Sequence, residues 1–284
     1  MLRRVRLLRS PIDELTITGS RWSRLLARAV RENAAKPPKS PAPAQCITLI
    51  PTLHVASVEF YDKVLDYMVQ AVKQRDNVVI LLEGICDNEE GEVQQMEEYF
   101  EIARNEELKA IMLHKADQNT LYNEETMKAI CEELSVKYEP LVKAQATVRL
   151  QDFYLKPKMA ALVGGYLRND ADLNMKEVEA LLLDENSSGS GNGDTCIPIS
   201  RLGVHPAVRG RREAKVAKAA QLRCVEWFHR ECDGEVIVPW GFYHAEGIKH
   251  NILAMNAHDA DVVFVESDDT LCRVPFGVSK ELLA

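Results

Sequence analysis

Two histidines and one glutamate in this sequence each follow a short apolar segment that has the pattern of a buried strand. They are His54, Glu83 and His244. In open α/β sheets, ligands bind beyond the carboxyl ends of the strands. We therefore expect these three side chains to converge at one edge of a sheet, although they lie far apart in the sequence.

Two imidazoles and one carboxylate suit a divalent transition metal that keeps open positions for water. Such an ion lowers the pKa of bound water and supplies hydroxide near neutral pH. The residues alone leave a second interpretation open, in which each histidine is a hydrogen-bonded loop residue. Glu83 is harder to explain in that way, because a carboxylate at a buried strand end needs a cation or several donors.

Short apolar runs alternate with longer helical patterns from Cys46 onward, which predicts an α/β fold with a largely parallel, mixed sheet and helices on both faces. In the first helical pattern, apolar residues recur at helical spacing between 57 and 73. The predicted strands are 47–50, 78–82, 235–239 and 261–265, and the predicted helices are 57–73, 91–113, 123–138, 158–167, 174–183, 213–230 and 246–254.

Four segments carry a resemblance to a known family. The sequence Pro-Thr-Leu-His at 51–54 precedes a helix and a strand that ends in Glu83, and Gly-Phe-Tyr-His at 241–244 forms a second motif. Between them, Arg212 leads a helix with a small residue five positions on, and 169–173 form an acidic turn. These features resemble the TraB/PrgY and Tiki group over most of residues 45–266.

The resemblance implies a metal-dependent hydrolase, with a peptide as one candidate substrate. It implies His54, Glu83 and His244 as metal ligands for Mn, Co or Zn, and Glu83 and Arg212 as catalytic groups. Arg212 has an alternative interpretation as a surface arginine. Pro51 stands where the family has Gly, and it removes a backbone donor. This departure keeps a second function open, a catalytically degenerate domain that serves as a scaffold subunit of a mitochondrial complex.

Residues 1–44 form a basic arm, with ten Lys and Arg against three acids over residues 1–40. Arginines and apolar residues occupy different faces of a helical pattern between 21 and 31, and a Pro-rich stretch follows. This pattern predicts a mitochondrial targeting segment and linker. The alternative is a surface helix that binds the domain or a protein partner, in which case the protein is cytoplasmic or retains its arm.

The remaining residues, 45–284, are predicted to form one domain with a flexible Ser/Gly-rich insertion at 186–195. Their acidic charge does not favour nucleic-acid binding except through the basic arm. The sequence has no Walker A or GxGxxG motif, so no nucleotide cofactor is expected. It has no apolar run of the roughly 20 residues that span a bilayer. Its seven cysteines form no CxxC pair, which favours a reducing compartment.

Overall fold

The computed structural model describes residues 2–9, 44–118, 123–144, 146–188, 205–255 and 264–270. Most of the predicted basic arm, including its helical pattern at 21–31, lies outside the described residues. Residues 186–188 of the predicted insertion at 186–195 are helical, because α7 (Met175–Ser188) extends to Ser188, and the rest of the insertion lies outside the described residues. The targeting segment and the flexible insertion therefore stay predictions.

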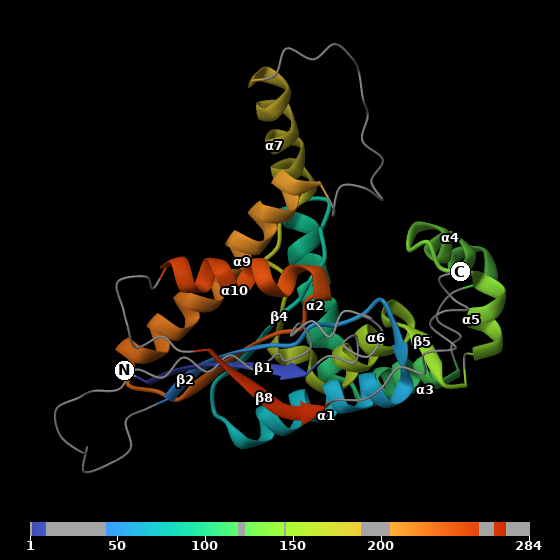
Figure 1. The fold of residues 1–284 in the computed structure, drawn as a ribbon. Coiled ribbons are helices and arrows are strands. Elements are labelled where there is room, and N and C mark those ends of the chain that lie inside the picture. The colour runs from blue at the N-terminus through green and yellow to red at the C-terminus, as the bar shows by residue number, and fades with distance from the viewer. Residues whose placement is uncertain are drawn as a thin grey trace.

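A parallel sheet forms the centre of the molecule, as the sequence predicts (Figure 1). Its order is β6-β4-β7-β2-β1-β8. The strands are β1 (Leu2–Arg9), β2 (Ala44–Leu49), β4 (Val78–Leu81), β6 (Leu167–Arg168), β7 (Gly234–Val238) and β8 (Phe264–Thr270). The short strands β3 (Val55–Ser57) and β5 (Val148–Leu150) form a separate antiparallel pair. The α/β class is confirmed, and β1 shows that residues 2–9 of the basic arm form a strand beside β2.

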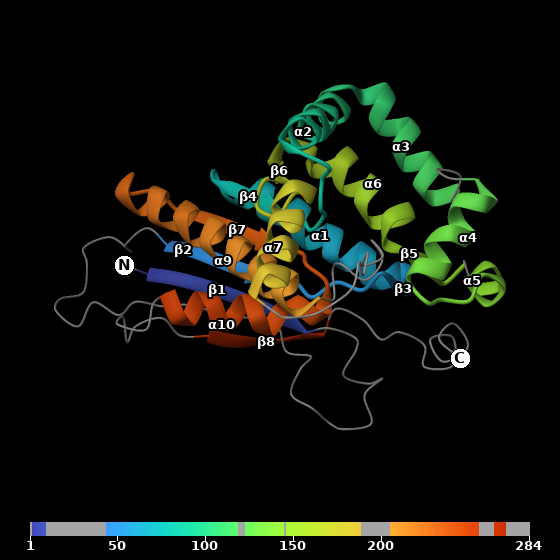
Figure 2. The ribbon, with the colours of Figure 1, turned by 90° about the horizontal axis from the view of Figure 1, so that it is seen from above.

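Helices cover both faces of the sheet, with α9 and α10 over one face and α1 and α6 over the other (Figure 1). The helices are α1 (Val58–Gln74), α2 (Glu89–Arg104), α3 (Glu106–Gln118), α4 (Glu124–Glu133), α5 (Tyr138–Ala144), α6 (Gln151–Val163), α7 (Met175–Ser188), α9 (Pro206–His229) and α10 (Ala245–Met255), with the 3-10 turns η3 (Gly164–Tyr166) and η4 (Phe242–His244). Figure 2 shows α2 to α5 gathered to one side of the sheet.

Helix α1 illustrates how the sequence determines an element. Its start is fixed by Ser57, whose Oγ accepts from the backbone N–H of Phe60. Its apolar residues at helical spacing, among them Phe60 and Val64, are buried against the strands in the main core. The predicted helix at 91–113 is wrong in one respect, because Asn105 interrupts it. The Asn105 side chain accepts from the backbone N–H of Glu107 and caps α3.

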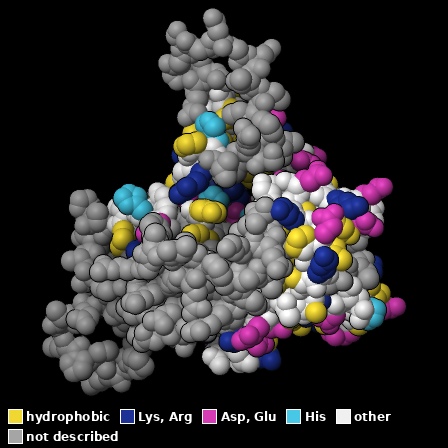
Figure 3. All heavy atoms as spheres, turned by 45° about the vertical axis from the view of Figure 1, so that its right-hand side comes forward, with side chains coloured by type: hydrophobic (Ala, Val, Ile, Leu, Met, Phe, Trp, Pro, Cys, Tyr) yellow, Lys and Arg dark blue, Asp and Glu magenta, His cyan; other side chains and the backbone are white. Residues whose placement is uncertain are grey.

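On the described surface, charges are mixed. Figure 3 shows acidic and basic side chains interspersed over the described part of one face, without a continuous basic area there. Within the described ranges, no helix is both long enough and apolar enough to cross a membrane.

Candidate functional site

The carboxyl ends of β6, β4 and β7 lie side by side in the sheet, and each is followed by a residue of one polar cluster. Asp172 follows β6, Glu83 follows β4, and His244 lies in η4 after β7. Helix α9 adds Arg212 and Glu213. We call these five residues the strand-end cluster. Its position agrees with the expectation that ligand sites form beyond the carboxyl ends of parallel strands.

Glu83 lies at the centre of the strand-end cluster. Its Oε2 accepts a short hydrogen bond from the backbone N–H of Gly241. Gly241 permits this approach, because a Cβ at that position would lie 3.0 Å from the same oxygen. Burial alone would raise the pKa of Glu83, but the hydrogen bond and charge of His244, together with Arg212, lower that pKa to about 2. Glu83 is therefore ionised at neutral pH.

Arg212 is buried, at 5% exposure, and is held by a bidentate ion pair with Asp172. The distances are 2.8 Å from Nε to Oδ1 and 2.6 Å from Nη2 to Oδ2. The Asp172 carboxylate also accepts from the backbone N–H groups of Gly84 and Leu173. Two parallel hydrogen bonds fix the plane of a guanidinium. Arg212 is thus a positioned group of the site, and its interpretation as a surface arginine is wrong.

His244 is buried, and its Nδ1 lies 3.1 Å from Oε1 of Glu213. The same carboxylate oxygen accepts from Arg209 Nε at 2.8 Å. The Trp240 ring packs edge-on against the imidazole at 5.4 Å between centroids. Burial alone would lower the pKa of His244, but Glu213 and then Glu83 raise it. The two carboxylates therefore stabilise the protonated form of the imidazole.

The inner contacts of the cluster are longer than its outer ones. Nε2 of His244 lies 3.4 Å from Glu83 Oε1 and 3.3 Å from Arg212 Nη1, and Arg212 Nη2 lies 3.5 Å from Glu83 Oε1. Normal hydrogen bonds of this kind span about 2.7–3.2 Å. Each group is therefore anchored on its outer side by one partner, while the three meet only loosely on their inner sides. The three groups are therefore positioned mainly by their outer partners and only weakly by one another.

His54 is exposed and lies between β2 and β3, and β3 pairs with β5 outside the main sheet. The backbone oxygen of Leu53 accepts from Tyr61 Oη, and that of His54 accepts from the Gln151 N–H. No hydrogen bond or ion pair of the described residues joins the His54 side chain to the strand-end cluster. The structure thus brings together Glu83, Arg212 and His244, and it does not place His54 in contact with them.

Pro51 does not interrupt the sheet. The backbone N–H of Ile50 donates to the Val238 oxygen, and that of Thr52 donates to the Trp240 oxygen. Both hydrogen bonds join this part of the chain to the β7 segment. Alternate residues of a parallel strand face the same neighbour, so the N–H that Pro51 lacks would point away from β7. The Pro in place of Gly is compatible with the observed pairing beside the site.

Two residues of the site hold donors suitable for one metal ion. Glu83 Oε1 and His244 Nε2 are 3.4 Å apart. Two ligand atoms that each lie about 2.1 Å from a tetrahedral ion have a separation of about 3.4 Å. The described residues contain no group of three or more His, Cys, Asp or Glu side chains arranged to hold an ion. The separation of the pair matches one ion, but Arg212 Nη1 lies 3.3 Å from His244 Nε2 and Arg212 Nη2 lies 3.5 Å from Glu83 Oε1, so an ion there would also face the guanidinium charge. The metal stays a prediction.

Sequence reasoning did not find Asp172 or Glu213 as site residues. Asp172 lies in the acidic turn at 169–173, and Glu213 directly follows Arg212. Both pair with a site residue through an element distant in sequence, which the local pattern does not reveal. Their position in or beside segments that carry the family resemblance was the available signal that they belong to the site.

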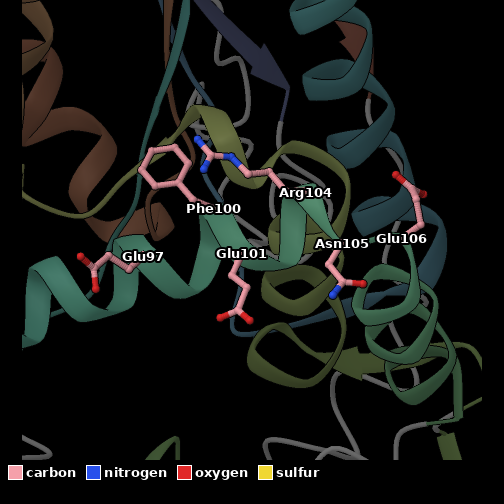
Figure 4. A pocket seen from close by; sticks show the side chains of 6 residues that line it. All are labelled: Glu97, Phe100, Glu101, Arg104, Asn105 and Glu106. Atoms are coloured by element: carbon pink, nitrogen blue, oxygen red, sulfur yellow. The ribbon is translucent and has the colours of Figure 1, made fainter.

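A separate surface pocket lies along α2 and at the start of α3 (Figure 4). It is lined by Glu97, Phe100, Glu101, Arg104, Asn105 and Glu106. The Arg104 guanidinium lies 5.7 Å from the centroid of the Phe100 ring, and Asn105 caps α3. These contacts account for the junction of the two helices, and none of the predicted site residues lines this pocket.

The fold and the site together define an α/β protein with a buried acid–base cluster at the carboxyl edge of a parallel sheet. Compared with known proteins, the chain matches no family model, no curated protein and no solved structure. The resemblance to the TraB group therefore rests on the sequence motifs alone.

Proposed function

We propose that this chain is a hydrolase of the TraB/PrgY type, with Glu83, Arg212 and His244 as its reaction centre. The observation that supports the proposal is the contrast between firm outer anchors and loose inner contacts. Arg212 is fixed by Asp172 at 2.6 and 2.8 Å, whereas its guanidinium and the His244 ring approach Glu83 Oε1 only to 3.5 and 3.4 Å. Catalytic groups need to be held in place in this way, while their remaining hydrogen-bonding atoms stay available to the substrate.

Each group has a role that its environment supports. Glu83, ionised in its position beside two cations, orients an attacking water through Oε1 and accepts the proton that the water loses as its oxygen bonds to the carbonyl carbon. Arg212, whose charge is fixed by Asp172, stabilises the negative charge that develops on a carbonyl oxygen. His244, with a raised pKa, holds a proton that it gives to the leaving group. Glu213 is a positioning residue that fixes the imidazole through Nδ1.

A divalent ion would be held by Glu83 and His244. When bound, it would lower the pKa of a coordinated water. Binding an ion requires neutral His244, so it competes with the proton that Glu213 and Glu83 favour. Such a centre would hydrolyse acyl bonds, and peptides are one class of substrate that contains them.

A non-catalytic scaffold is the second candidate. One observation favours it: Arg209, which pairs with Glu213, adds a cation beside the cluster, so that the three carboxylates are matched by three cations when His244 is protonated. Such a network also ties η4 and α9 to the strand ends. Association with a mitochondrial complex through residues 1–44 belongs to this candidate.

The two candidates differ in whether product forms. The full chain is incubated in H₂¹⁸O with a panel of peptides and carboxylic esters, with and without Mn²⁺, Co²⁺ or Zn²⁺, and products are analysed by mass spectrometry. A hydrolase places one ¹⁸O in a new carboxyl group. Absence of labelled product over the whole panel, from protein shown to be folded, would favour the scaffold.

A further inference from the structure

The strand β1 is an inner strand of the sheet. It pairs in parallel with β2 on one side, from Leu2 opposite Ala44 to Leu7 opposite Leu49. On its other side it pairs in parallel with β8, and Figure 2 shows β1 between these two strands. Alternate residues of a parallel strand face the same neighbour, so the backbone groups of β1 are divided between β2 and β8.

The place of β8 in the sheet depends on β1. Among the described strands, β8 pairs with β1 alone, because it lies at the end of the order β6-β4-β7-β2-β1-β8. Without β1, the described sheet offers β8 no partner, and the side of β2 that faces β1 becomes an open edge. An edge strand has a row of unpaired N–H and C=O groups, and even two paired strands are only marginally stable by themselves.

We infer that residues 2–9 are a structural part of the folded protein, which they complete by holding β8 on the sheet. A form of the chain that loses these residues, through processing within the basic arm, loses β8 from the sheet as well. A partner cannot bind residues 2–9 as a separate segment while β8 stays paired with them. The inference concerns the basic arm and is independent of the proposed hydrolase.

The placement of β1 is tested by a disulfide bond. Arg4 lies opposite Cys46 in the register of β1 and β2. Neighbouring strands are about 4.8 Å apart, and disulfides join residues whose Cα atoms lie about 4.4–6.8 Å apart. The full chain carrying Arg4→Cys is oxidised, and the linked peptides are identified by mass spectrometry. We expect a bond between positions 4 and 46.

The matched control is Leu7→Cys. Leu7 lies opposite Leu49, which is three residues from Cys46 and therefore about 10 Å away along β2. A thiol at position 7 should not form a bond with Cys46, because this separation exceeds the reach of a disulfide. Absence of the bond between positions 4 and 46 in a folded protein, or an equal yield of bonds from positions 4 and 7, would overturn the inference.

The dependence of β8 on β1 is tested by hydrogen exchange on the full chain carrying Val5→Pro. Proline removes a backbone donor from the middle of this inner strand. The amides of β8 should exchange at least about tenfold faster than in the wild type, whereas those of β4, which pairs with β6 and β7, should keep their protection.

Should Val5→Pro unfold the whole domain, so that β4 loses its protection as well, Val5→Gly weakens the same strand while it keeps the backbone donor. Faster exchange of β8 alone supports the inference in either variant. Unchanged exchange of β8 in both variants would overturn it, because β8 would then hold its place without β1. Neither assay depends on hydrolysis, so a failed hydrolase and a failed role of β1 give different results.

Discussion

The carboxylate of Glu213 occupies the space that a side chain at position 247 would need. A Cβ at Gly247 would lie 1.7 Å from Glu213 Oε2, which is far inside van der Waals contact. Since Oε1 of the same carboxylate holds the His244 ring, the absence of a side chain at 247 determines where the imidazole lies. A glycine on α10 is thereby coupled to the reaction centre through one acid of α9.

Gly247→Ala should therefore displace Glu213 and release Nδ1 of His244. We expect a loss of about 1–3 kcal/mol in the free energy of unfolding, measured in urea, because the core must shift to admit a methyl group. The matched control is Gly210→Ala on α9, where a Cβ would meet nothing within 4 Å. That exposed helical position should gain up to about 1 kcal/mol. Equal effects of the two substitutions would contradict this coupling.

Arg212→Lys should weaken the protein although it keeps the charge. A lysine cannot form the two parallel bonds that Arg212 makes with Asp172, so part of a fully buried carboxylate loses its donors. The expected loss is about 1–3 kcal/mol in the free energy of unfolding. Arg211→Lys, at the neighbouring exposed position, provides the control and should change stability little. A large effect at 211, or none at 212, would refute the assigned role of the guanidinium.

Acid should remove a part of the stability that depends on Glu83. The pKa of this carboxyl falls from 4.5 to about 2 in the folded protein, so the unfolded chain binds the proton more tightly. The contribution is present above pH 4.5 and is lost as the pH falls toward 2. Unfolding free energies measured across this range should decline less steeply for Glu83→Gln than for the wild type. Parallel curves would show that Glu83 is not stabilised in its ionised form.

A divalent ion should raise the melting temperature of the wild-type protein through Glu83 and His244. Mn²⁺, Co²⁺ and Zn²⁺ are each titrated against the wild type, His244→Ala and His54→Ala. We expect His244→Ala to abolish the shift, because it removes one of two donors that lie 3.4 Å apart. Since His54 is exposed and outside the cluster, His54→Ala should retain the shift. Equal shifts in the wild type and His244→Ala would exclude this metal site.

The sequence predicted the elements that carry the site better than the contacts within it. Glu83 and His244 follow strands with a strong apolar pattern. Because the carboxyl ends of parallel strands lie at one edge of a sheet, this pattern was enough to predict that the two side chains converge. Glu213 and Asp172 were missed, because their partners lie on distant elements and no local pattern marks a tertiary ion pair. His54 follows a strand as well, but the chain after it joins the β3–β5 pair, and strand periodicity does not determine the direction of a loop.

The reaction centre is tested most directly by the rate of hydrolysis and the melting temperature, measured on the same preparations of wild type and Glu83→Gln. The comparison uses the best substrate found in the ¹⁸O panel. Glu83→Gln keeps the shape of the side chain but removes the charge that orients water, so we predict a rate loss of about 100-fold or more in a protein that remains folded. Equal rates in two folded proteins would contradict the account, because catalysis would then not involve Glu83.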